Sequence, residues 1–85
     1  PNLLETHRSR GLVLLSTQNI AEAIHEFKTA IAINDKIADL HLSLGFAYRL
    51  NGENDLAEEE LITAFDLNPD SPIAPTEISL AYAYE

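Results

Sequence analysis

The sequence predicts an all-α protein built from stacked helix-turn-helix units, and three observations support this fold class. Aligning residues 1–34 with residues 35–68 gives eight identical pairs among 34, where unrelated sequences of ordinary composition give about two. Apolar residues recur at intervals of three and four within each unit, which is helical spacing. Asparagine, glycine and proline, which end helices, separate these segments. We therefore predict one domain with repeats over about 4–37 and 38–71, and a partial repeat or capping helix over 72–85.

The first repeat is expected to contain two helices. One runs from about Leu3 to Ser16, and the next continues to Ile33 after a break at residues 17–19. Asn19 followed by Glu22 resembles a capping box, in which each side chain bonds a backbone N–H of the helix start.

The second repeat follows the same plan. A helix over about 40–50 is stopped by Asn51-Gly52, and a second helix runs from about Asp55 to Leu67, before Asn68-Pro69. The buried stripe of this second helix is predicted to contain Leu56, Ala57, Leu61, Ala64, Phe65 and Leu67.

Small residues recur at the repeat period. Gly11 aligns with Gly45, and Ala23 aligns with Ala57. A glycine inside a helix costs about 1 kcal/mol relative to alanine, so its recurrence indicates a packing requirement. We expect the two helices of each repeat to approach closely at these positions.

These residues resemble the tetratricopeptide repeat, a helix-turn-helix unit of 34 residues. Gly45, Tyr48, Ala57, Ala64 and Pro69 match its small, aromatic, alanine and proline positions. The first repeat departs from the pattern, with Arg10 for a leucine, Leu14 for the aromatic and Asp35 for the proline. The resemblance implies a short right-handed α-solenoid that acts as a protein-protein interaction scaffold. From the residues themselves we expect no catalytic activity and no cofactor or metal.

The resemblance also implies a concave groove, lined by the first helix of each repeat, for a peptide or partner helix. Because most matching positions are apolar, the carboxylate clamp of one subgroup is not expected, and the groove should suit an apolar segment. The positions that match groove-lining residues are Arg8, Leu12, Leu15, Leu42, Phe46, Arg49, Thr76, Leu80 and Ala83.

Alternatives to peptide binding stay open. The last predicted helix lacks a partner helix of its own, and further repeats, a second copy of the chain or an external partner are all able to cover it. Two functions stay open beside peptide binding: a self-association module that forms homo-oligomers, and a non-catalytic domain attached to an enzyme.

Charge and composition exclude several function classes. The net charge is −9 with only five Lys and Arg residues, so nucleic acid is not an expected partner. The chain has no cysteine, which excludes disulfides and thiolate chemistry. No apolar run is long enough to predict membrane insertion. Residues 43–85 hold one basic and nine acidic residues, which are either a solvated face or an attraction for a basic partner. The compartment is unknown, with the cytoplasm as the default.

The sequence offers little for catalysis. His7 and His41 are repeat equivalents, and a packing role is favoured over a shared metal or acid-base role. His25 is expected on a wet surface. Glu58-Glu59-Glu60 points around a helix in three directions and is interpreted as a solvated run.

Overall fold

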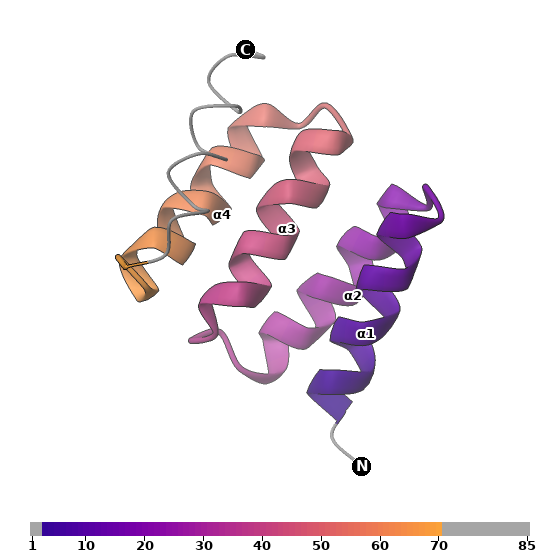
Figure 1. Cartoon of the computed structure of the whole chain (residues 1–85), viewed down its shortest axis with the longest axis horizontal. Coiled ribbons are helices and arrows are strands. Elements are labelled where there is room, and N and C mark those ends of the chain that lie inside the picture. Colours follow the sequence, from indigo (N-terminus) through magenta and orange to yellow (C-terminus); the bar gives the residue numbers. More distant parts are fainter. Residues whose placement is uncertain (1–2, 71–85) are drawn as a thin grey trace.

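The computed structural model describes residues 3–70 and contains four α-helices over that range. They are α1 (Leu3–Ser16), α2 (Ile20–Ile33), α3 (Ala38–Leu50) and α4 (Asn54–Leu67). The first two helices form one hairpin and the last two form another, with α2 packed against α3 (Figure 1). The predicted helical repeat stack is therefore confirmed, with helix bounds within two residues of those expected. The predicted third element at 72–85 lies outside the described residues.

The turns inside the two hairpins use the same backbone conformation with different residues. Gly52 has φ of 81°, and its repeat equivalent Gln18 has φ of 68°. Glycine adopts this left-handed conformation without steric cost, whereas other residues pay for the clash of their Cβ. The turn chemistry is thus well matched in the second repeat and strained in the first.

The capping box predicted at the start of α2 is wrong. Asn19 makes no side-chain bond to the helix backbone; its amide instead donates to Thr17 Oγ1 at 2.9 Å. The Asn19 side chain is thus used within the turn that precedes α2, next to the left-handed Gln18.

The core lies between the helices of each hairpin and between the hairpins. Phe27, Leu40 and Leu61 are its largest fully buried side chains. Ala23, Ala30, Ala47 and Ala57 are also completely buried, where their small size lets neighbouring backbones approach. The alanine positions of the repeat therefore have a packing role in this structure.

The two recurring glycines lie where helices cross closely, as predicted. A Cβ on Gly45 would stand 2.7 Å from Leu61 Cγ and 3.3 Å from the carbonyl oxygen of Ala57. A Cβ on Gly11 would stand 2.6 Å from the Phe27 ring. In the first repeat the three atoms nearest to that Cβ all belong to the Phe27 ring, and none belongs to Ala23. Gly11 therefore makes room for this ring.

The predicted buried stripe of α4 is only half correct. Ala57, Leu61 and Ala64 are buried, but Leu56, Phe65 and Leu67 are 40%, 37% and 37% exposed. Among the described helices only α3 packs against α4. Apolar residues on the other side of α4 therefore have no described helix to cover them, although helical periodicity alone counted them as core.

Candidate interaction surface

The predicted groove residues of the first two repeats lie on equivalent stripes of α1 and α3. Arg8, Leu12 and Leu15 follow one face of α1 at intervals of four and three. Their repeat equivalents on α3 are Leu42, Phe46 and Arg49. The two helices contact each other, so the stripes belong to neighbouring elements. Thr76, Leu80 and Ala83, the predicted third stripe, lie outside the described residues.

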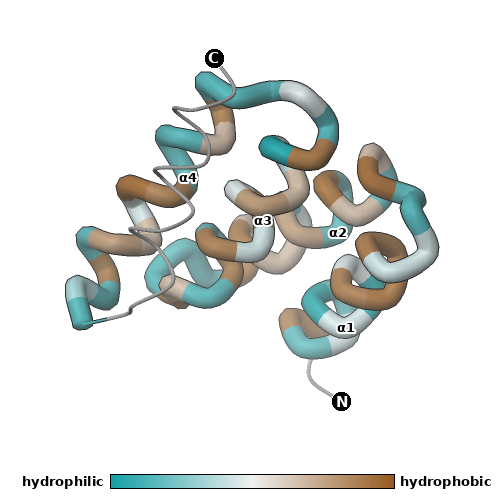
Figure 2. Tube along the Cα trace, turned by 45° about the horizontal axis from the view of Figure 1, so that its top comes forward, coloured by the Kyte–Doolittle hydropathy of each residue, from teal (hydrophilic) through white to brown (hydrophobic). Residues whose placement is uncertain are grey.

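The exposure of these side chains shows which are available to a partner. Leu12 is 43% exposed. Phe46 and Arg8 are half-buried, while Leu15 and Leu42 pack partly against the core. Apolar and polar segments alternate along α1 and α3 in Figure 2, and the exposed apolar residues of these helices include Leu12 and Val13 of α1 and Leu50 of α3. Leu12 is therefore accessible to a partner, whereas Leu15 and Leu42 contribute in part to the core.

Two arginines frame the apolar stripe. The Arg49 guanidinium lies over the Phe46 ring, with Cζ 5.1 Å from the ring centroid, a geometry that favours cation–π attraction. Arg8 donates to the Glu5 carboxylate at 3.3 Å, one turn earlier on α1. Both cations are therefore held against their own helix.

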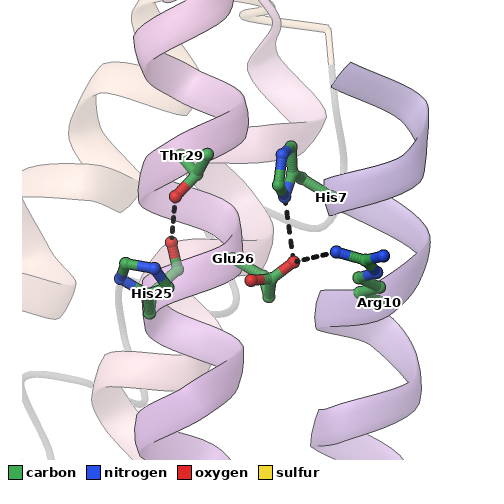
Figure 3. A network of polar contacts seen from close by, with 5 residues as sticks. All are labelled: His7, Arg10, His25, Glu26 and Thr29. Carbon is green, nitrogen blue, oxygen red and sulfur yellow. Dashed lines mark hydrogen bonds and ion pairs between the residues drawn. The ribbon is translucent and has the colours of Figure 1, made fainter. Parts of the chain in front are cut away.

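A second feature is a histidine–glutamate pair inside each repeat. His7 Nδ1 lies 2.9 Å from Glu26 Oε1, joining α1 to α2 (Figure 3). His41 Nδ1 lies 2.7 Å from Glu60 Oε1, joining α3 to α4. These are the same two repeat positions, so the bridge between the helices is itself repeated. The favoured packing role of both histidines now has a specific form, in which each pairs with a carboxylate of its own repeat.

The surroundings of Glu26 favour its ionised form. His7 hydrogen-bonds its carboxylate, and Arg10 Nη1 lies 4.0 Å from the same oxygen. The hydrogen bond from His7 is the main cause that lowers the pKa of Glu26 below its ordinary value of 4.5, against an opposing effect of burial. His25, shown nearby in Figure 3, is exposed as predicted.

The pair in the second repeat makes one more contact. The other ring nitrogen of His41, Nε2, lies 2.8 Å from the carbonyl oxygen of Asp35 in the connection between α2 and α3. Beside it, burial and, to a smaller degree, the charge of Glu60 raise the pKa of Tyr48 above its ordinary value of 10.0. Glu60 is thus half-buried and paired, and Glu58 is half-buried as well, so the interpretation of residues 58–60 as a solvated run is wrong for both and holds only for Glu59.

Sequence reasoning also missed two clefts that lie outside the predicted groove. One, of about 490 Å³, is lined by residues of α1 and α2 that include Arg10, Val13 and Glu22. The other, of about 300 Å³, lies where α2 meets α3 and α4 and includes Lys28, His41 and Tyr48. Both clefts contain a member of a histidine–glutamate pair. His7 and His41 are separated by the 34-residue repeat period, and so are Glu26 and Glu60. This spacing was the signal in the sequence that could have revealed the pairs.

The described residues offer neither a metal site nor a membrane-spanning helix. Residues 3–70 contain no group of three or more side chains that could hold a metal ion. None of the four helices is long and apolar enough to cross a membrane.

Comparison with protein families agrees with this architecture. A family model described as TPR repeat matches residues 11–52, and one described as Tetratricopeptide repeat matches residues 38–71. A search of curated proteins finds no match to the chain. Repeats of this kind generally mediate protein-protein interaction and are generally non-catalytic. With the matches, the two hairpins and the shared packing positions in agreement, the chain belongs to the tetratricopeptide repeat family.

Proposed function

We propose that this domain binds an apolar peptide or amphipathic partner helix along the stripe formed by α1 and α3. The observation that carries the proposal is the pairing of Leu12 and Phe46, which occupy the same repeat position on two contacting helices and both keep exposed surface. An apolar side chain placed between them would bury surface on both helices. A partner helix with apolar residues at helical spacing fits such a stripe.

The arginines refine the chemistry of the partner. Phe46 with Arg49 stacked upon it presents a flat apolar and cationic surface, and aromatic and arginine side chains are enriched where binding energy concentrates. An acidic or amide group beside the apolar anchor of the partner would suit Arg49 and Arg8. The acidic second half of the chain offers a separate attraction for basic groups on the same partner, at longer range.

The proposal is tested by selecting helical peptides of about 15 residues from a displayed library and measuring their affinity by calorimetry. Phe46→Glu places a charge in the stripe and should weaken binding by at least tenfold while the circular dichroism spectrum stays helical. Val13→Glu is the matched control, because Val13 is 61% exposed on α1 but lies outside the stripe. Equal loss in both variants, or no loss in Phe46→Glu, would move the site elsewhere.

Salt dependence distinguishes binding to the apolar stripe from electrostatic attraction by the acidic second half of the chain. Binding governed by the apolar stripe should weaken less than threefold between about 0.1 M and 0.5 M salt, because screening acts on charges and the Debye length shortens over this range. A steep loss of affinity would instead favour the acidic half as the main site. Light scattering on the free domain tests for self-association, because a domain that forms oligomers would have a mass that rises with concentration.

A further inference from the structure

The turn between α3 and α4 contains a chemically reactive pair of residues. Asn51 is the one asparagine of the sequence that precedes a glycine, and Asn51 and Gly52 form this turn. The side-chain carbon of an asparagine is open to attack by the backbone nitrogen of the next residue. Glycine offers that nitrogen with no Cβ to hinder it, and a Cβ built on Gly52 would have no neighbour within 4 Å. Both residues are exposed, so water reaches them.

The reaction that this pair supports is deamidation, and its only co-reactant is water. The Gly52 nitrogen bonds to Cγ of Asn51, the bond from Cγ to Nδ2 breaks, and Nδ2 leaves as ammonia with the proton of the Gly52 amide. A five-membered succinimide ring remains. Water then opens the ring at one of its two carbonyl carbons, which gives aspartate or isoaspartate. Each event therefore replaces a neutral amide by a carboxylate.

The folded turn keeps the two reacting groups apart. Asn51 has ψ of 1°. The Gly52 nitrogen then lies about 120° from Cβ around the Cα–C bond, because the substituents of a tetrahedral carbon are evenly spread. Ring closure needs these two atoms on the same side. The Gly52 N–H also donates to the Arg49 carbonyl oxygen at 3.0 Å, and Asn51 Nδ2 donates to Glu53 Oε2 at 3.0 Å. The turn must therefore open before the ring can form.

The product suits this turn less well than asparagine does. A carboxylate at residue 51 has no hydrogen to donate to Glu53, so the present contact of 3.0 Å would join two like charges. Residue 51 is also the C-cap of α3, where the helix dipole disfavours a negative charge. Residues 43–85 already hold nine acidic residues and one basic residue. The new carboxylate therefore opposes closure of the turn.

From these observations we propose that Asn51-Gly52 is a deamidation site controlled by the α3–α4 turn. Opening of the turn permits the reaction, and the carboxylate that forms then favours the open turn. Because ammonia is lost, the chain does not return to its first state. The equivalent turn between α1 and α2 has Thr17 and Gln18 at these positions, so of the two described hairpins only the second has this site.

The first test measures deamidation of the wild-type chain at neutral pH, with and without a denaturing concentration of urea, by mass spectrometry of protease fragments. Asn51 should react at least about tenfold more slowly in the folded chain, because the turn is closed for most of the time. Asn19 precedes a β-branched isoleucine and is the internal control, with little product in either condition. Equal rates at Asn51 in the folded and the unfolded chain would overturn the proposal.

The second test measures what the product does to the fold. Asn51→Asp has the carboxylate of one product on an ordinary main chain, and its unfolding equilibrium constant should be about fivefold that of the wild type. Adding Glu53→Gln should remove most of this difference, since the glutamine amide donates to the new carboxylate. Asn51→Gln keeps an amide at this position and is the matched control, with a constant close to that of the wild type.

An unchanged unfolding constant in Asn51→Asp, or no recovery with Glu53→Gln, would contradict the expected effect of the carboxylate on the turn. If Asn51→Asp does not fold, the two deamidation rates of the wild type still decide whether the turn controls the reaction. Asn51 lies outside the stripe of α1 and α3, so peptide binding and this modification fail or succeed separately.

Discussion

The two repeats have the same backbone plan and differ in how well their side chains suit it. At the left-handed turn position the second repeat has glycine and the first has Gln18. At the bridge between helices, the His41 ring contacts both the Glu60 carboxylate and the Asp35 carbonyl, whereas among residues 3–70 the His7 ring has one such contact, to Glu26. The comparison teaches that a repeat tolerates departures in its turn and its bridge as long as the packing positions occupied by glycine and alanine are kept.

The largest expected effect concerns the helix crossing that the repeats share. Gly45→Leu should abolish cooperative folding, at a cost above about 4 kcal/mol, because even a Cβ would meet Leu61 and the Ala57 carbonyl. Gly11→Leu should cost a similar amount, since the Phe27 ring that it would meet is completely buried.

Urea unfolding followed by circular dichroism measures both changes. Glu59→Leu, which places the same side chain at an exposed site of α4, should leave the transition nearly unchanged. A cooperative transition at the wild-type midpoint in either glycine variant would show that the crossing is not tight there.

A smaller effect is expected at the bridge of the first repeat. Because the pKa of Glu26 is lowered in the folded state, its ionised form stabilises the fold at pH values above 4.5, and this contribution is lost as the pH falls through the lowered pKa. Glu26→Gln should therefore lower the unfolding free energy near pH 6 by about 0.5–1 kcal/mol and reduce the loss of stability between pH 6 and pH 3.

Chemical denaturation at several pH values between 3 and 6 checks this prediction. Glu22→Gln, a change of the same kind at an exposed position of α2, is its control. Parallel pH profiles for the wild type and Glu26→Gln would mean that the bond from His7 adds no net stability to the ionised form.

The smallest effect concerns the strained turn. Gln18→Gly should stabilise the domain by about 0.5–1 kcal/mol, because relief of the left-handed strain exceeds the added entropy of the unfolded chain. Gly52→Ala in the second repeat should destabilise it by about 1 kcal/mol for the converse reason. Thermal unfolding of both variants decides the matter, and a lower melting temperature for Gln18→Gly would show that the turn is held by other contacts.

The sequence predicted the repeat and its helix ends well because these depend on local chemistry. Asn51-Gly52 and Asn68-Pro69 end helices through their own backbone preferences, whatever lies around them. Prediction failed where a side chain had a choice of partners. Asn19 bonded Thr17 in place of the helix start, and Phe65 was counted as core although no described helix covers it.

In the candidate site, too, features set by local spacing were predicted and contacts between helices were not. Helical spacing and the repeat period placed Leu12 and Phe46 on equivalent stripes, and the structure puts those stripes on contacting helices. The sequence also contained His7, His41, Glu26 and Glu60 at the repeat period, but it did not indicate that they pair. Each pair joins residues 19 positions apart on different helices, so its contact depends on how two helices cross.

By itself the sequence determined the two repeats of the described range, the positions of their turns and the small residues at the helix crossings. These follow from backbone propensity and periodicity, which act over a few residues. Only the tertiary structure decided that His41 of α3 reaches both Glu60 and the Asp35 carbonyl, because α4 and the α2–α3 connection must both be brought within about 3 Å of its ring. The distance between segments is set by core packing, and local sequence preferences carry no information about it.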